Sequence, residues 1–321
     1  AGAAAPASDP PARSGDGDGD APGQPAVPTD RDQPAAMNPT PAEPPQPTEP
    51  PPADADPDPP VEPRGENCLL PGDGSYGELG PYQVGKLSAT IGDLHQQYTI
   101  FYPVPFADEC KHPIVAWGNA TGVGGFEKYE FLNANAASWG LVVIAAHTPN
   151  AYDPEPFTTG IDWLLAQNED PASIFHGKLS ARAGVAGTEQ AGVGASLSTT
   201  HPNVEALVAA YANANPMLGP RIAYACLTGN EDILSNGYCT KAFETAAGPA
   251  FLASWHGADF FAPTREQYEM NNPASFAVQR LYAAWMRCFL ADDAVACKMF
   301  RGEPCGMCDE EGWARIEGRN L

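Results

Sequence analysis

The sequence predicts an α/β fold, in which a mostly parallel central sheet carries helices on both faces. Short apolar runs such as Pro113–Trp117 and Leu141–Ala146 are typical of strands that are buried on both faces. Amphipathic segments such as Thr158–Gln167 lie between such runs. Because buried strands alternate with helices along the chain, we expect helices on both sides of the sheet.

The first expected elements come from residue type and spacing. The run QYTIFYP (Gln97–Pro103) has the aromatic and β-branched content of a strand, and PIVAW ends at a loop that starts with Gly118-Asn119. Residues 127–138 have helical spacing and end before Gly140. The strand LVVIAA and the amphipathic helix TTGIDWLLAQ follow.

The second half continues the alternation. A strand over 183–186 leads through the turn GTEQAG into a helix of small residues over 190–198. Three further short apolar runs predict strands, at 204–210, 222–226 and 250–254. The segment ASFAVQRLYAAWMRCFL (Ala274–Leu290) is the longest expected helix.

The first 63 residues have a different composition from the rest of the chain. They hold 19 of the 35 prolines, 12 acidic residues and two arginines, and they contain no Trp, Tyr, Phe, Ile or Leu. Such a segment cannot bury enough apolar surface to offset the entropy of ordering. We therefore expect a disordered acidic linker over residues 1–65 and one α/β domain over residues 66–321.

The charge and hydropathy of the chain limit its partners. The net charge is −23, of which −10 lies in the first 63 residues, so nucleic acid and anionic membrane surfaces are poor partners. No apolar run has the ~20 residues of a membrane span. We expect a monomer that is secreted or held at a bacterial cell surface, with a lipid anchor preceding Ala1, and with no metal or cofactor.

All eight cysteines lie in the expected domain. Their even number and scatter favour disulfides in an oxidising compartment, and Cys226 with Cys239 is the pair that we expect. A zinc site at Cys305-Gly306-Met307-Cys308 is the alternative, although no second ligand pair accompanies it.

The order of several motifs resembles the α/β-hydrolase superfamily. The motifs are WGNATG, SWGLVVIAAHT, GIDWLLAQN, GTEQAG, GNEDI and SWHGAD, spread over Gly80–Trp313. Within the superfamily the chain looks most like bacterial secreted polyester hydrolases, that is, cutinase-like, dienelactone-hydrolase-like and poly(ethylene terephthalate) hydrolase-like enzymes. The resemblance implies an α/β-hydrolase fold and carboxylic-ester hydrolysis.

The resemblance also implies a nucleophile, an acid and a histidine in this chain order. These positions hold Glu189, Asp232 and His256, and the oxyanion would be bound by the backbone N–H groups of Asn119 and Gln190. Glu231 is a rival for the acid, while His147 and His201 are rivals that stand at other places in the order. An ordinary turn role for Asp232 is the alternative to a catalytic one.

Aromatic residues are expected to line the substrate cleft, with Trp117, Tyr211 and Trp255 as the main candidates. Further candidates for the cleft are Phe126, Tyr129 and Phe260. The alternative is that most of these rings belong to the core.

The residue at the tip of the turn departs from the family pattern, because glutamate replaces serine. A carboxylate is already ionised near neutral pH and needs no base to activate it. Three functions follow: an ester hydrolase with a Glu-His-Asp site, a disabled homologue that binds or scaffolds, or a carboxylate-nucleophile hydrolase of the haloalkane dehalogenase or epoxide hydrolase type. A Glu189–His256 ion pair without chemistry would suit the second.

Overall fold

The computed structural model describes residue 70 and residues 72–92, 95–106, 110–122, 125–150, 152–214 and 217–321. The expected disordered linker over residues 1–65 lies outside the described residues.

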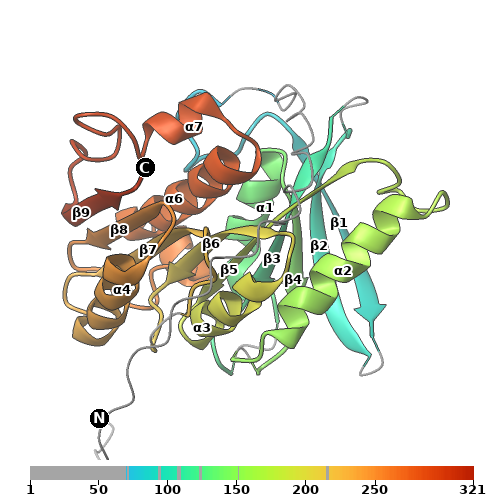
Figure 1. Cartoon of the computed structure of the whole chain (residues 1–321), viewed down its shortest axis with the longest axis horizontal. Helices are drawn as coiled ribbons and strands as arrows, with labels where there is room; N and C mark the ends of the chain where they lie inside the picture. Colours follow the sequence, from blue (N-terminus) through green and yellow to red (C-terminus); the bar gives the residue numbers. More distant parts are fainter. Residues whose placement is uncertain are drawn as a thin grey trace, which may run out of the picture. The chain divides into compact units, whose positions relative to one another are not determined.

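A single sheet forms the centre of the described part (Figure 1). Its nine strands are β1 (Gln83–Ile91), β2 (Gln96–Val104), β3 (His112–Gly118), β4 (Val142–Ala146), β5 (Leu179–Thr188), β6 (Val204–Ala210), β7 (Ala223–Gly229), β8 (Ala250–Trp255) and β9 (Trp313–Arg319). Their order in space is β1-β2-β4-β3-β5-β6-β7-β8-β9. The six strands from β4 to β8 are parallel, whereas β1, β2 and β9 pair antiparallel at the two edges. The predicted α/β class with a mostly parallel sheet is confirmed.

Helices cover both faces of the sheet. Those described are α1 (Glu130–Ser138), α2 (Glu155–Glu169), α3 (Gln190–Leu197), α4 (Ile233–Thr245), α5 (Arg265–Glu269), α6 (Pro273–Leu290) and α7 (Ala294–Lys298), with short 3₁₀ turns at Glu127–Tyr129 and Ser198–Thr200. In Figure 1, α2, α3 and α4 lie on one face and α1 and α6 on the other.

Each face buries its own hydrophobic cluster, because successive strand residues point to opposite sides. In β3, Val115 and Trp117 belong to the cluster under α1 and α6, and Ile114 and Ala116 belong to the cluster under α2, α3 and α4. The buried runs predicted from the sequence are therefore strands that have no solvent-facing side.

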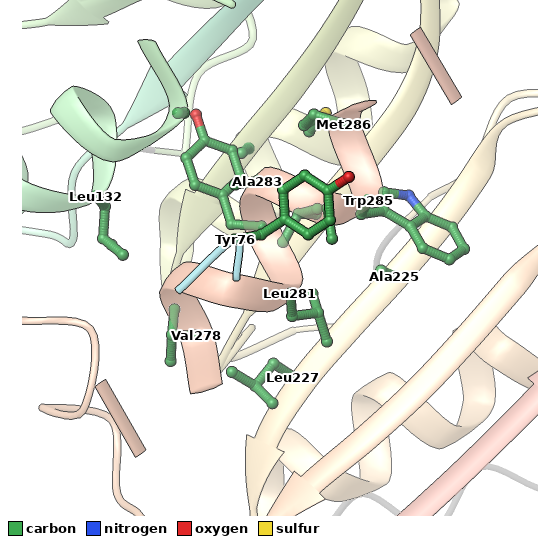
Figure 2. Close-up of a cluster of buried hydrophobic side chains, with 14 of the residues drawn as sticks. Tyr76, Leu132, Ala225, Leu227, Val278, Leu281, Ala283, Trp285 and Met286 are labelled. Carbon is green, nitrogen blue, oxygen red and sulfur yellow. The ribbon is translucent and has the colours of Figure 1, made fainter. Parts of the chain in front are cut away.

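Helix α6 supplies much of the first cluster. Figure 2 shows Val278, Leu281 and Trp285 of α6 gathered with Ala225 and Leu227 of β7. These apolar positions recur at three- and four-residue spacing, which places them along one face of the helix.

The end of α6 holds a buried ion pair. Arg287 is fully buried, and its Nε donates to Oδ2 of Asp293 at 2.6 Å. The same carboxylate accepts a hydrogen bond from the Tyr76 hydroxyl at 2.7 Å. Burial raises the pKa of Asp293, but the guanidinium and these hydrogen bonds outweigh burial and hold the pKa below its ordinary value. The remaining Arg287 donors bond the carbonyls of Trp139 and Leu70, so this arginine ties α6 to the chain before β1.

The disulfides confirm one predicted pair and exclude the zinc alternative. Cys226 of β7 is joined to Cys239 of α4, as expected. Cys305 and Cys308 are joined to each other, so the C-x-x-C motif is a disulfide and not a metal site. Cys288 pairs with Cys297, and Cys110 is disulfide-bonded as well. Disulfides are compatible with the expected oxidising compartment.

The described ranges lack two features. They contain no helix that is both long and apolar enough to cross a bilayer. No group of three or more His, Cys, Asp or Glu side chains in them is arranged to hold a metal ion.

Five of the described elements were not predicted, namely strands β1 and β9 and helices α4, α5 and α7. Strands β1 and β9 form the sheet edges, where polar and charged residues such as those of WARIEGR replace the buried apolar runs. Helix α4 has an exposed apolar start and a glycine, Gly237, in its interior, so its helical period is weak.

Candidate active site

The predicted turn GTEQAG forms a tight corner between β5 and α3. Its tip, Glu189, has φ 53° and ψ −121°, a region that residues with a side chain rarely adopt. Its N–H donates to the carbonyl of Ala210 at 2.9 Å, and its carbonyl accepts from the N–H of Gly192 at 3.1 Å. A Cβ at Gly187 would lie 2.5 Å from the carbonyl oxygen of Ala191, so the chain turns too tightly there for a side chain.

The loop after β3 lies beside this corner. Gly118 of β3 is in register with Gly187 of β5, and a Cβ at Gly118 would lie 2.8 Å from the Cβ of Ala191. Further along the loop, Thr121 donates a hydrogen bond from its hydroxyl to the side-chain carbonyl of Gln190. The two backbone segments expected to form the oxyanion site are therefore neighbours.

Two backbone donors at this place have no acceptor in the part of the chain that the structure describes. Within the described residues, no hydrogen bond uses the N–H of Asn119 or the N–H of Gln190. The second is one of the unsatisfied donors at the start of a helix. The side chain of Asn119 holds its loop in place: its amide donates to the carbonyls of Ala146 and Gly125, and its oxygen accepts from the indole of Trp117. Unpaired N–H groups held in this way are suited to bind a developing oxyanion.

The carboxylate of Glu189 is half-buried and makes no hydrogen bond or ion pair with the described residues. Burial raises the pKa of Glu189, and the nearby negative charge of Asp232 raises it further. Burial is the main cause of the raised pKa of the Tyr129 phenol; the backbone N–H of Ala120 opposes the rise, and the negative charge of Glu189 adds to it. Glu189 therefore lies near both Asp232 and the loop after β3, and no cation among the described residues forms an ion pair with it.

Asp232 follows β7 and begins α4. Its Oδ1 accepts a hydrogen bond from the N–H of Ser235 at 3.1 Å, which makes Asp232 the N-cap of the helix. It is partly buried, whereas its rival Glu231 is exposed. Asp232 thus has the local role foreseen as the alternative, while its charge also acts on Glu189.

His256 follows β8, the strand next to β7. Gly229 and Trp255 are in register at the ends of these strands, and Asn230 accepts a hydrogen bond from the N–H of Gly257 at 2.8 Å. The loops that carry Asp232 and His256 are therefore linked. The imidazole of His256 is exposed and makes no hydrogen bond with the described residues, so neither a Glu189–His256 ion pair nor an Asp232–His256 hydrogen bond is present.

The rival histidines have other partners. Nε2 of His147 lies 2.8 Å from the hydroxyl of Thr99, and its ring stacks on Phe126. His201 lies just before β6, at the amino-terminal ends of the strands, whereas the corner of Glu189 follows their carboxyl ends. Its Nε2 is 3.0 Å from a carboxylate oxygen of Asp162.

The aromatic residues expected in a cleft divide into two groups. Trp117 and Tyr211 are 2% and 1% exposed and belong to the core, so they support the sheet beneath the corner instead of facing a substrate. Trp255 is partly buried and contacts Trp313 edge-on, with 4.7 Å between the ring centroids. Phe260, in the loop after β8, is 43% exposed.

Sequence reasoning missed an exposed apolar group beside the candidate site. Ile233 and Leu234 follow Asp232 directly and are 82% and 71% exposed, and Phe261 is 49% exposed next to Phe260. Large apolar residues inside loop-like segments were the available signal. Exposed apolar groups of this kind mark binding surfaces for apolar ligands.

The chain was also compared with known proteins. No protein-family model matches it, and no curated protein matches it.

Proposed function

We propose that the protein is a carboxylic-ester hydrolase with an α/β-hydrolase type of site, in which Glu189 takes the place of the usual serine. The observation that carries this proposal is the corner itself. A half-buried carboxylate stands at a strained strand-to-helix turn, next to two backbone N–H groups that have no acceptor among the described residues. Strain of this kind, at about 1–3 kcal/mol, persists where a turn must present its tip residue.

The proposed reaction starts with attack by the carboxylate of Glu189 on the ester carbonyl carbon. The carbonyl electrons move to the oxygen, which the N–H groups of Asn119 and Gln190 stabilise. Collapse breaks the bond to the alkoxide, which receives a proton from His256, and leaves a mixed anhydride on Glu189. Water then attacks the anhydride while neutral His256 accepts its proton, which releases the acid and restores the carboxylate.

The charge and surface of the protein favour a neutral, apolar ester. The net charge of −23 repels anionic substrates. The exposed side chains of Ile233 and Leu234 lie at the start of α4, directly after Asp232, and those of Phe260 and Phe261 lie in the loop after β8 that carries His256. There they would contact an apolar or polymeric ester.

The test is hydrolysis of p-nitrophenyl butyrate by the wild type and two variants. Glu189→Gln keeps the shape of the side chain but removes its charge, and we expect it to lower kcat/KM at least ~100-fold. Glu244→Gln removes an exposed carboxylate from α4 and should leave the rate unchanged. Acid quenching during turnover should leave an acyl adduct on the peptide that contains Glu189. Equal rates for wild type and Glu189→Gln would refute a role for this carboxylate.

A second candidate is a disabled hydrolase that binds its ligand without turning it over. It is favoured by the use of Asp232 as a helix cap and by the absence of a hydrogen bond between the imidazole of His256 and any described residue. This candidate predicts an inactive wild type and a gain of esterase activity in Glu189→Ser. Turnover of a haloalkane with no turnover of esters would instead indicate a carboxylate nucleophile that attacks saturated carbon.

A further inference from the structure

A cavity at the amino-terminal ends of the parallel strands is lined by several positively charged side chains. Its volume is about 960 Å³, and it is lined by the first residues of β6 and β7 and by the segment from the end of α6 to Arg301. The corner of Glu189 and the loop of His256 follow the carboxyl ends of the strands, so the length of the sheet separates this cavity from the candidate active site. The size is within the range of sites for small ligands.

The charge of the cavity is opposite to that of the protein. Four of the 17 Lys and Arg residues of the chain line it, against two carboxylates. The cations are Arg182, Arg221, Lys298 and Arg301. A concave site lined by one sign of charge concentrates ligands of the other sign.

The two carboxylates are already held by one of these cations. Arg182 contacts Glu205 and Asp292, each at 2.8 Å, and it also donates to the carbonyl of Phe289. The charge of Arg182 is therefore already balanced by these carboxylates, and its contacts hold β5 against β6 and the end of α6.

The other three cations have no such partner. Within the described residues, Arg221, Lys298 and Arg301 make no ion pair, and all three are exposed. Arg301 lies over the ring of Phe289, 5.4 Å from its centroid, and this contact leaves its charge uncompensated. Arg221 has φ 75°, an unfavourable backbone conformation for a long side chain, and such strain is concentrated at functional sites.

We propose that this cavity binds a small anion that carries two or more negative charges, held by Arg221, Lys298 and Arg301. Arginine matches carboxylate and phosphate groups through paired N–H donors. Val204, Ile222 and Phe289 also line the cavity, so an apolar part of the ligand would have side chains to contact. This site is independent of the ester chemistry proposed above.

The test is isothermal titration calorimetry of the full chain with two probes, pyrophosphate for a phosphate ligand and citrate for a carboxylate ligand. Saturable binding of either is expected, and the tighter one identifies the source. Lys298→Gln and Arg301→Gln should each weaken binding at least ~10-fold, because each removes a charge-assisted contact. The matched control is Arg265→Gln, which removes an equal charge from α5 and should bind as the wild type does.

Thermal unfolding without anion shows whether each variant is folded, and a rise of the unfolding temperature with either anion is a second readout that should be smaller in Lys298→Gln and Arg301→Gln. The proposal is overturned if the wild type binds neither anion at millimolar concentration, or if Arg265→Gln weakens binding as much as Lys298→Gln does.

Discussion

Replacing Glu189 by glycine should stabilise the protein while it abolishes activity. At φ 53° and ψ −121°, a residue with a Cβ costs about 1–3 kcal/mol, and glycine does not incur this cost. Glycine also increases the conformational entropy of the unfolded chain. This lowers the free energy of unfolding by about 0.4–1 kcal/mol relative to alanine. Taking the middle of each range, about 2 and about 0.7 kcal/mol, Glu189→Gly is predicted to be about 1.3 kcal/mol more stable to unfolding than Glu189→Ala.

The comparison with Glu189→Ala isolates the backbone contribution, because both variants remove the same half-buried carboxylate. Urea unfolding measured by circular dichroism gives the free energy of unfolding of each. At an ordinary helical position alanine is more stable than glycine. Glu244→Gly and Glu244→Ala on α4 are therefore the control pair, and there the alanine variant should be the more stable one. Equal stability of the two variants at residue 189, or greater stability of alanine, would refute the strained corner on which the proposed site depends.

Three further predictions concern charge and cross-links. Asp293→Ala leaves a buried guanidinium unpaired and should lower the free energy of unfolding by about 3–5 kcal/mol in urea. Because the pKa of Asp293 is lowered on folding, its contribution to the free energy of unfolding is present above the ordinary pKa of ~3.9 and should be lost as the pH falls below that value. Equal urea midpoints at pH ~6 and pH ~3 would contradict this. Asp232→Asn removes a charge that raises the pKa of Glu189, so the acid limb of the pH–rate profile should move to lower pH, and an unmoved limb counts against their proximity. Replacing both Cys226 and Cys239 by alanine, which opens a loop with a sequence separation of 13, should cost about 3 kcal/mol by the same urea assay, and an unchanged midpoint would show that this bond does not stabilise the fold.

The elements of the core could be predicted because their signal is local. Val204–Ala210 was expected as a strand and is β6 without change, and the long helix expected over Ala274–Leu290 begins one residue earlier in the structure. A strand buried on both faces needs an uninterrupted apolar run, and the run is visible in the sequence. Edge strand β9 could not be found in this way, because its side chains are mostly charged or half-exposed and only its pairing with β8 defines it.

The sequence by itself determined the corner: the glycines and alanines around Glu189 are the residues that can turn this tightly, and backbone sterics act between near neighbours. Only the tertiary structure decided what each polar group contacts. In the structure the carboxylate of Asp232 caps the start of α4, and the imidazole of His256 is exposed. Arg221, Lys298 and Arg301, which are up to 80 residues apart in the sequence, line one cavity. A side chain's partner depends on packing between distant segments, and no local pattern records that packing.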